Sequence, residues 1–507
     1  MSSRTKPRAP SRTRRVLAEG APKLVRDLVV LVGGQFASKL IGLAAFAVLA
    51  RRLDPQGYGT VEYIVGIAAF FAMAIDCGLG MIGVRRIAAS PAEMPVLAAQ
   101  IPLARLAIAL LAIPVMVVGV TTLGPPGALT GLVWLYAASL LFAAWNQDWL
   151  LQASELMTQV AIAQTIRMLV FAMMVLLLVH GPADMMDVGW AEIAAAAVAT
   201  LYYLRLQHVK VTPVRISFSL FRMVALVREG ASLGLAQFVW VAAQFLPLFL
   251  VGSIVGGAAV GWFAAALRLV TSISTLSNVY HFNLYPAVAR AATVSGAALA
   301  ELMRASFRVT AWFGVGFAMA LTLTATSILT TIYGARFAAA APALAILIWV
   351  IPIMFLSGHA RFSLVVASAQ RGVLYGQIAG LAAVALAGGP LVVLLGDVGA
   401  AIAAVTGNIA VWGISHAFAS RLRTPPPSFS LVVKPLMLAL VLGVGVQYSG
   451  LGPSMSAISA IVLYGVLAPL VDRALIPDFI KLAHAKAATA AAGGNARSDP
   501  VTPIDRN

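Results

Sequence analysis

The side chains in this 507-residue sequence that could do chemistry are cations placed inside long apolar segments. Lys39 lies in the middle of FASKLIGLAAF (36–46), and Arg167, Arg268 and Arg361 interrupt other apolar runs. A charge at the centre of a bilayer costs about 2.5–3.5 kcal/mol on insertion scales, so each should face a polar interior or reach an interface. Arginine binds phosphate through its bidentate fork, and lysine binds it as a point charge. Because a positive interior concentrates anions, the pattern predicts an anionic, phosphate-bearing ligand.

The surroundings of Lys39 favour a position that faces a cavity. At 1.5 Å per residue Lys39 is about 15 Å from either membrane surface, farther than a lysine side chain reaches. Gln35, Ser38, Lys39 and Gly42 are spaced i, i+3, i+4 and i+7, so they share one face of a helix. The alternative is a stabilising ion pair between Lys39 and an intramembrane acid.

Four arginines are further candidates for the same interior. Arg268 heads a polar stripe in its segment, Arg167 follows Gln164 at helical spacing, and Arg361 lies in SGHARFS (357–363). For these three arginines a structural hydrogen bond between helices is the alternative. Arg105 lies about two turns into its segment, where a cavity-facing role and a snorkelling anchor are both open. The predicted binding residues are therefore Lys39, Arg167, Arg268, Arg361, Gln35 and Arg105.

Acidic residues are sparse in the same segments. Only Asp76 and Asp148 are clearly intramembrane; both lie near the predicted cytoplasmic ends, and they are the candidate partners of Lys39. Glu62 and Glu192 are placed close to the outer ends. An antiporter of cationic drugs needs acids at mid-membrane to exchange against protons or sodium. The charge balance therefore favours an anionic ligand over a cationic one.

The elements that position these residues are membrane-spanning helices. The chain is 61% hydrophobic and only 10% charged, with a mean hydropathy of +0.93, which excludes an ordinary soluble domain. An apolar run of about 20 residues can cross the hydrocarbon core as a helix. The sequence predicts an all-α polytopic membrane protein with fourteen such spans, near 28–50, 58–80, 97–120, 130–151, 157–179, 187–207, 230–252, 261–285, 309–331, 341–365, 373–395, 397–419, 430–449 and 454–475.

The net charge of +17 follows the membrane topology rather than a nucleic acid. With cytoplasmic N- and C-termini, most of the 35 Lys and Arg fall in cytoplasmic segments, which is the positive-inside rule. Outside the spans, Arg51, Arg52 and Arg336 are the exceptions, and the first two are expected to snorkel into headgroups. The single cysteine, Cys77, excludes an intramolecular disulfide, and no Cys/His cluster has metal-ligand spacing. We expect no metal, cofactor or nucleic-acid partner.

A weak internal repeat divides the chain into two similar parts. An offset of 202 residues aligns LVRD (24–27) with LVRE (226–229) and Gly59 with Gly261. Six spans separate the copies, so the repeat is parallel, as in transporters whose site lies between two six-helix lobes. The expected parts are a disordered tail (1–22), an N-terminal lobe (23–207), a cytoplasmic linker (208–229), a C-terminal lobe (230–420), two added helices (421–481) and a second disordered tail (482–507).

Several motifs resemble those of the Wzx-type polysaccharide transporter family of the multidrug/oligosaccharidyl-lipid/polysaccharide (MOP) superfamily. Residues 47–88 resemble its A-R-x-L-x-P-x-x-Y/F-G turn followed by D-x-G-L and an arginine. DWLLQASELM (148–157) is similar to its W-x-x-Q-G-x-E-x-M motif, with Ala153 in place of glycine. Residues 256–270 and 333–347 resemble two later motifs in the same order. The charged residue that many members carry late in span seven is absent from QFLPLF (244–249).

The resemblance implies two bundles of six helices around a cationic cavity. It also implies a flippase that moves an undecaprenyl-diphosphate-linked oligosaccharide from the cytoplasmic to the periplasmic leaflet of the bacterial inner membrane, for O-antigen, exopolysaccharide or capsule biosynthesis. Expected partners are the lipid-linked oligosaccharide and membrane lipids, with a polymerase or chain-length protein left open.

Three alternatives differ from this interpretation in what they require of the chain. A multidrug or small-molecule cation antiporter of the same superfamily needs more intramembrane acids. A membrane glycosyltransferase or ligase needs a large outer loop with catalytic residues, and the predicted outer loops are short. A scaffold that transports nothing stays open as a third alternative, although a charged interior is costly without a ligand. We therefore expect a transporter and not an enzyme.

Overall fold

The computed structural model describes residues 12–123, 130–213, 218–367, 369–423, 425–448, 450 and 452–482. The helices are α1 (Arg12–Asp76), α2 (Leu79–Ala89), α3 (Met94–Leu123), α4 (Thr130–Ala143), α5 (Asp148–Ala153), α6 (Met157–Leu178), α7 (Met185–Leu206), α8 (Leu220–Ile254), α9 (Gly257–Val294), α10 (Gly296–Leu323), α11 (Ala325–Tyr333), α12 (Ala341–Leu347), α13 (Val350–Val366), α14 (Gln370–Ala419), α15 (Ser430–Gln447) and α16 (Pro453–Val471). Short 3₁₀ or π turns are η1 (Pro91–Glu93), η2 (Pro182–Asp184), η3 (Gln207–Val211) and η4 (Ala335–Ala340).

The helices correspond to the predicted membrane spans. Among the described residues, nine helical stretches are long and apolar enough to cross a membrane. Two of them, 33–89 and 370–419, are 57 and 50 residues long and contain a kink at Asp54 and at Gly396, so each covers two predicted spans. The predicted spans near 130–151, 187–207 and 430–449 are also helical, as α4, α7 and α15. The prediction of an all-α polytopic membrane protein is confirmed.

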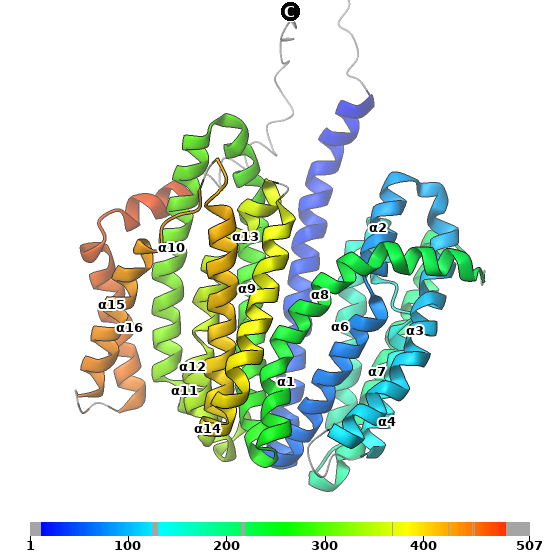
Figure 1. Cartoon of the computed structure of the whole chain (residues 1–507), viewed down its shortest axis with the longest axis horizontal. Coiled ribbons are helices and arrows are strands. Elements are labelled where there is room, and N and C mark those ends of the chain that lie inside the picture. Colours follow the sequence, from blue (N-terminus) through cyan, green and yellow to red (C-terminus); the bar gives the residue numbers. More distant parts are fainter. Residues whose placement is uncertain are drawn as a thin grey trace, which may run out of the picture.

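The helices form two halves with two helices added at one side. In Figure 1 the first half (α1–α7) lies on the right, the second half (α8–α14) in the centre and left, and α15 and α16 at the far left. The most extensive helix contacts are those of α1 with α6 and of α8 with α14, which are equivalent pairs under the predicted repeat. α8 begins over the first half and descends beside α1 into the second, so this helix joins the two halves.

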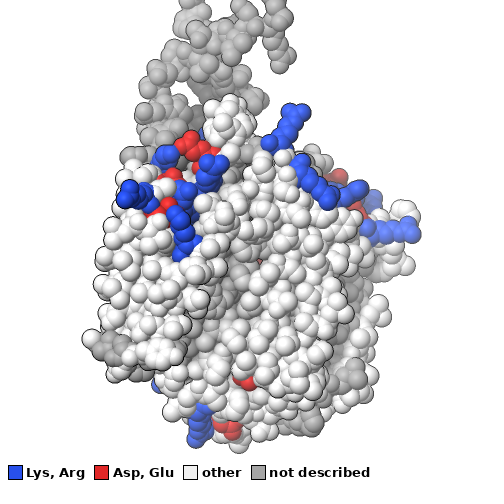
Figure 2. All heavy atoms as spheres, turned by 60° about the vertical axis from the view of Figure 1, so that its left-hand side comes forward, with Lys and Arg blue, Asp and Glu red and all other residues white. Residues whose placement is uncertain are grey.

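The two ends of the molecule differ in charge. Lys and Arg gather at the upper end of the face shown in Figure 2, and the middle of that face carries almost none. We call this end, where α14 ends and α15 begins, the basic end, and the end with the kinks at Asp54 and Gly396 the opposite end. At the basic end Glu229 of α8 pairs with Arg85 and Arg86 of α2.

The kink in α1 follows from the residues around it. Asp54 has a φ of 62°, which breaks the helix, and its side-chain Oδ1 accepts a hydrogen bond from the Gly57 backbone N–H at 2.8 Å. Pro55 follows at the first helical position, where the missing N–H costs nothing. The LDPQGYG segment therefore ends one membrane crossing and caps the start of the next.

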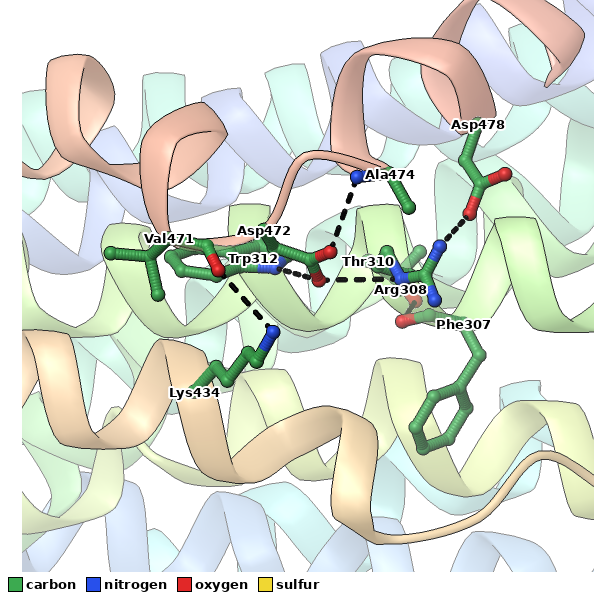
Figure 3. Close-up of polar contacts among 9 residues, drawn as sticks. All are labelled: Phe307, Arg308, Thr310, Trp312, Lys434, Val471, Asp472, Ala474 and Asp478. Carbon is green, nitrogen blue, oxygen red and sulfur yellow. Dashed lines mark hydrogen bonds and ion pairs between the residues drawn. The ribbon is translucent and has the colours of Figure 1, made fainter.

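The added helices are fixed to α10 by a polar cluster near the basic end. Figure 3 shows Arg308 between Asp472 and Asp478, and the Trp312 indole N–H donates to Asp472 Oδ2 at 3.2 Å. The Tyr464 hydroxyl of α16 donates to the Trp312 carbonyl at 3.0 Å. These contacts attach α15 and α16 to the second half and leave the first half untouched.

The terminal and linker segments differ in part from expectation. α1 begins at Arg12, inside the segment 1–22 predicted to be disordered, whereas residues 1–11 and 483–507 lie outside the described residues. In the predicted linker 208–229, the π turn at Gln207–Val211 extends α7, and α8 is already helical from Leu220. The adjoining helices therefore extend into both segments.

Candidate functional site

Two adjoining cavities lie along the contact between the halves. The larger, of about 740 Å³, is lined by α1, α4, the start of α5, α6, α7 and α9, and the smaller, of about 320 Å³, by α1, α8, α9, the end of α12, α13 and α14. Gln35, Lys39 and Thr271 line both. We refer to the two together as the central cavity, because shared walls from α1 and α9 make them neighbouring spaces.

Most of the predicted binding residues line this cavity. Gln35, Lys39, Arg167 and Arg268 border the larger space and Arg361 borders the smaller one. Arg105 borders neither. The predicted polar face of the first span is also in place, because Gln35, Ser38, Lys39 and Gly42 all line the larger cavity. Whether these residues bind a ligand stays a prediction, whereas their convergence is a structural fact.

Lys39 is exposed to the cavity and forms no ion pair with any residue that the structure describes. Its two candidate partners are engaged elsewhere. Asp76 pairs with Arg105, and Asp148 accepts a hydrogen bond from the Tyr203 hydroxyl. The stabilising-pair alternative for Lys39 therefore has no support within the described residues. A free ammonium group in a cavity can meet a ligand anion directly.

Arg361 is the second unpaired cation of the cavity. It lies on α13, and its guanidinium makes no ion pair within the described ranges. Its Nε is buried and has no hydrogen-bond partner there. A buried donor without a partner costs free energy that a bound acceptor would recover. Lys39 from the first half and Arg361 from the second thus line the cavity with a positive charge that no described acid neutralises.

Arg268 is neutralised by an acid that the sequence analysis assigned to an outer end. Its guanidinium binds the carboxylate of Glu62 through two nitrogens, with Arg268 Nη2 to Glu62 Oε2 at 2.7 Å, and lies over the Phe46 ring at 3.3 Å from the centroid. The Tyr58 hydroxyl donates to the same carboxylate at 2.6 Å. Arg268 is therefore held in place by α1, and its charge is largely neutralised by Glu62.

Arg167 is neutralised in the same way within the first half. Its guanidinium pairs with Glu192 of α7, and both residues line the larger cavity. The expectation that Glu62 and Glu192 lie apart from the intramembrane arginines was wrong, because each of these acids pairs with one of them. Tilted and kinked helices bring residues from different predicted depths to one level. No local pattern in the sequence marks Glu62 or Glu192 as the partner of an arginine on another helix.

Arg105 serves the packing of the first half. The side chain is 7% exposed, pairs with Asp76 and donates to the Asn146 carbonyl at 2.7 Å. The alternative of a cavity-facing Arg105 is not supported, because α1, α3 and the turn before α5 enclose it. Breaking such a buried pair leaves an uncompensated charge and costs about 3–5 kcal/mol. Arg105 therefore ties three segments together.

Arg51 and Arg52 were expected to snorkel into headgroups, but both bind helix ends. Arg51 donates to the Thr331 and Ile332 carbonyls at the end of α11, the latter at 3.0 Å. Arg52 donates to carbonyls at the end of α6. Cations at a helix C-terminus satisfy carbonyls that have no intrahelical partner. Arg51 thereby connects the two halves at the opposite end.

Aromatic packing closes the same end. Tyr58, Tyr333 and Phe337 are almost fully buried, with ring centroids 5.5–6.0 Å apart. Tyr58 comes from the first half and the other two from the second. Together with Arg51, these contacts separate the central cavity from the opposite end.

Comparison with known proteins agrees with this architecture. The solved structure of "Lipid II flippase MurJ, inward closed conformation" covers 88% of this chain and 100% of its own, with a TM-score of 0.70 and 10% identity. An inward-facing multidrug resistance MATE family transporter of the MOP superfamily covers 83% of this chain and 96% of its own, with a TM-score of 0.52 and 14% identity. A MOP superfamily transporter from Pyrococcus furiosus covers 81% and 98%, with a TM-score of 0.50 and 14% identity. At identities this low, the structural likeness establishes the fold alone, which is a polytopic transporter fold of the MOP type.

The family is established by sequence. Residues 24–292, more than half of the chain, match the family described as "Polysaccharide biosynthesis protein", and the chain belongs to this family. No curated protein sequence gives a significant match. The resemblance to a polysaccharide transporter family is confirmed at the level of this family, and the MOP-type fold agrees with it.

Proposed function

We propose that the protein is a flippase that moves an undecaprenyl-diphosphate-linked oligosaccharide from the cytoplasmic to the periplasmic leaflet of the bacterial inner membrane. The carrier would serve the assembly of O-antigen, exopolysaccharide or capsule. In this proposal the basic end is cytoplasmic, both termini are cytoplasmic, and no covalent chemistry takes place. The family membership and the MOP-type fold support a transporter of this class.

The observation that carries the proposal is the pair of unpaired cations in the central cavity. Lys39 belongs to the first half and Arg361 to the second, and both are free of ion pairs within the described residues. A diphosphate loses its hydration when it leaves water, and fixed cations offset that loss. A ligand held from both halves also couples binding to their relative movement, as alternating access requires. The prenyl chain stays in lipid.

The contacts at the opposite end fit one stage of this cycle. Tyr58, Tyr333, Phe337 and Arg51 hold the halves together on the proposed periplasmic side. The lipid carrier would then enter from the cytoplasmic leaflet, and release would require these contacts to separate. Binding that favours the separated state would shift the population between the two arrangements.

A cation antiporter of the same superfamily is less well supported. The acids near the cavity are already occupied, Glu62 by Arg268, Glu192 by Arg167 and Asp148 by Tyr203. A cationic drug would compete with arginines for these carboxylates. Unchanged sensitivity of cells to cationic dyes on expression is the expected result.

Binding of the bare lipid diphosphate tests the proposal directly. The full chain in lipid nanodiscs would be titrated with undecaprenyl diphosphate, comparing wild type with Lys39→Gln, Arg361→Gln and the control Arg336→Gln, an exposed arginine at the opposite end. Loss of a charge-assisted contact is worth about 1.5–3 kcal/mol, so each cavity variant should lose about tenfold or more in affinity. Equal affinity in all four proteins would overturn the proposal.

A strain in which the gene is deleted tests the proposed function in cells. Lipid-linked oligosaccharide should accumulate at the inner leaflet without the protein, and the wild-type gene should relieve the accumulation while Lys39→Gln does not. Normal glycan assembly in the deletion strain would contradict the assignment.

A further inference from the structure

The first half contributes a wall of the larger cavity whose charge differs from that of the two unpaired cations Lys39 and Arg361. It is formed by α4, the start of α5, α6 and α7, and carries hydroxyl, amide and carboxyl groups. Its polar residues include Tyr136, Asn146, Asp148, Arg167, Glu192 and Tyr203. Its only cation, Arg167, is paired with Glu192. The wall is therefore polar without a positive excess.

We propose that this wall is a sugar subsite for uncharged or amino-bearing units such as N-acetylhexosamines, and that it disfavours sugars carrying a carboxylate. The inference rests on the proposed function, because it assigns the glycan of the lipid carrier to one part of the same cavity. Lys39 and Arg361 then hold the diphosphate and the wall receives the sugar next to it.

Tyr136 supplies a vacant hydrogen-bonding group on this wall. The side chain is only 3% exposed and lines the larger cavity, and its hydroxyl has no hydrogen-bond partner in the part of the chain that the structure describes. Buried hydroxyls in folded proteins almost always have a partner. A sugar hydroxyl or an acetamido carbonyl in the cavity would supply the missing hydrogen-bond partner of the Tyr136 hydroxyl.

Asp148 makes the net charge of this wall negative. Its carboxylate accepts from the Tyr203 hydroxyl and faces the Asn146 amide at 3.4 Å, both neutral donors. A carboxylate has acceptor capacity for further donors, which sugar hydroxyls and amino groups provide. Because Glu192 is paired with Arg167, Asp148 is the acid of this wall whose charge is not compensated, and a uronic acid entering here would meet that carboxylate. Like charges in a site of low dielectric constant repel strongly.

Three lipid probes test the subsite in the full chain. Undecaprenyl diphosphate would be compared with the same lipid bearing one N-acetylglucosamine and one glucuronic acid. In wild type the N-acetylglucosamine probe should bind at least threefold more tightly than the bare lipid, and the glucuronic acid probe should bind no better than the bare lipid. Tyr136→Phe should remove most of the gain from N-acetylglucosamine and leave the affinity for the bare lipid unchanged.

Changes at the two carboxylates should alter the preference in a defined direction. Glu192→Gln releases Arg167, and Asp148→Asn removes a negative charge without leaving a cation unpaired. Both should raise the affinity for the glucuronic acid probe severalfold relative to N-acetylglucosamine, while the exposed Glu301→Gln at the basic end changes neither. Asp148→Asn keeps the test decisive if Glu192→Gln does not fold.

The outcomes separate this inference from the proposed function. If the bare lipid binds through Lys39 and Arg361 but glucuronic acid is accepted as well as N-acetylglucosamine, the subsite is wrong and the flippase proposal stands. The subsite is equally wrong if Tyr136→Phe and Asp148→Asn leave all three affinities unchanged. If the bare lipid does not bind, the proposed function itself fails.

Discussion

Gly59 and Gly261, which the predicted repeat aligns with each other, lie in direct contact at the opposite end. A Cβ atom on Gly59 would lie 2.5 Å from the Gly261 backbone nitrogen, and one on Gly261 would lie 1.9 Å from the Pro55 carbonyl oxygen. Two residues related by a repeat approach each other when the axis relating the copies passes near both. The parallel repeat predicted from an offset of 202 residues thus has a direct counterpart in the packing.

We predict that Gly261→Ala separates the halves at the opposite end. Backbone atoms cannot yield as a flexible side chain would, so overpacking should cost the closed arrangement about 1–3 kcal/mol. Thr271→Cys, introduced after Cys77→Ser, would report the opening by its reaction with a membrane-impermeant maleimide added from the periplasmic side. Labelling should rise severalfold in the Gly261→Ala background.

Gly119→Ala is the matched control, because a Cβ there meets no atom within 4 Å. It should leave both labelling and thermal stability as they are. Unchanged labelling in folded Gly261→Ala protein would show that this contact does not control the opening.

Arg51 and Arg52 are neighbours with different expected roles. Arg51 binds the end of α11 in the second half, whereas Arg52 binds the end of α6 in its own half. Each substitution by alanine should cost about 1–2 kcal/mol through unsatisfied helix-end carbonyls. Arg51→Ala should increase maleimide labelling of the cavity, and Arg52→Ala should lower the thermal midpoint without that increase. An identical effect of both variants would contradict the assignment of Arg51 as a contact between halves.

The turn before α7 should show an acid-dependent stability. Asp184 accepts hydrogen bonds from the His180 and Gly181 backbone N–H groups at 2.8 and 3.0 Å, and these bonds lower the pKa of its carboxyl below the ordinary 3.8. A group whose pKa is lowered in the folded state contributes stability above its ordinary pKa, and that contribution disappears as the pH falls through the lowered value.

Thermal unfolding of wild type and Asp184→Ala between pH 2.5 and 6 measures this contribution. The difference between the two midpoints should be constant above about pH 4 and should shrink at lower pH. Asp184→Asn, whose amide oxygen still accepts both bonds, should lie closer to wild type at pH 6. A gap that stays constant down to pH 2.5 would rule out the carboxylate as its source.

The cluster of Figure 3 should decide whether α15 and α16 stay attached. Arg308 is 15% exposed in its side chain and is paired with Asp478 and Asp472. Asp478→Ala leaves this arginine short of a partner, so the free energy of unfolding should fall by about 3 kcal/mol. Glu301→Ala, which breaks an exposed pair with Lys481, should leave the free energy of unfolding nearly unchanged. Unfolding in increasing denaturant provides both values, and equal losses would contradict a buried role for Asp478.

Part of the site could be predicted because helical periodicity is a local property. The spacing of Gln35, Ser38, Lys39 and Gly42 was enough to place them on one face, and all four line the cavity. The charge balance could not be predicted in the same way. Glu62 reaches Arg268 only because the kink at Asp54 turns the second crossing of α1 back against α9. A contact across 206 residues depends on helix tilt, which no local pattern records.

The sequence alone determined the class of molecule and its membrane spans, because hydropathy and helical periodicity are local properties of the chain and the bilayer requires apolar helices of about 20 residues. Tertiary structure alone decided which cations remain free. Arg105, Arg167 and Arg268 find acids on neighbouring helices, while Lys39 and Arg361 do not within the described residues. Pairing is a matter of a few ångströms between distant segments, and only the packed helices set those distances.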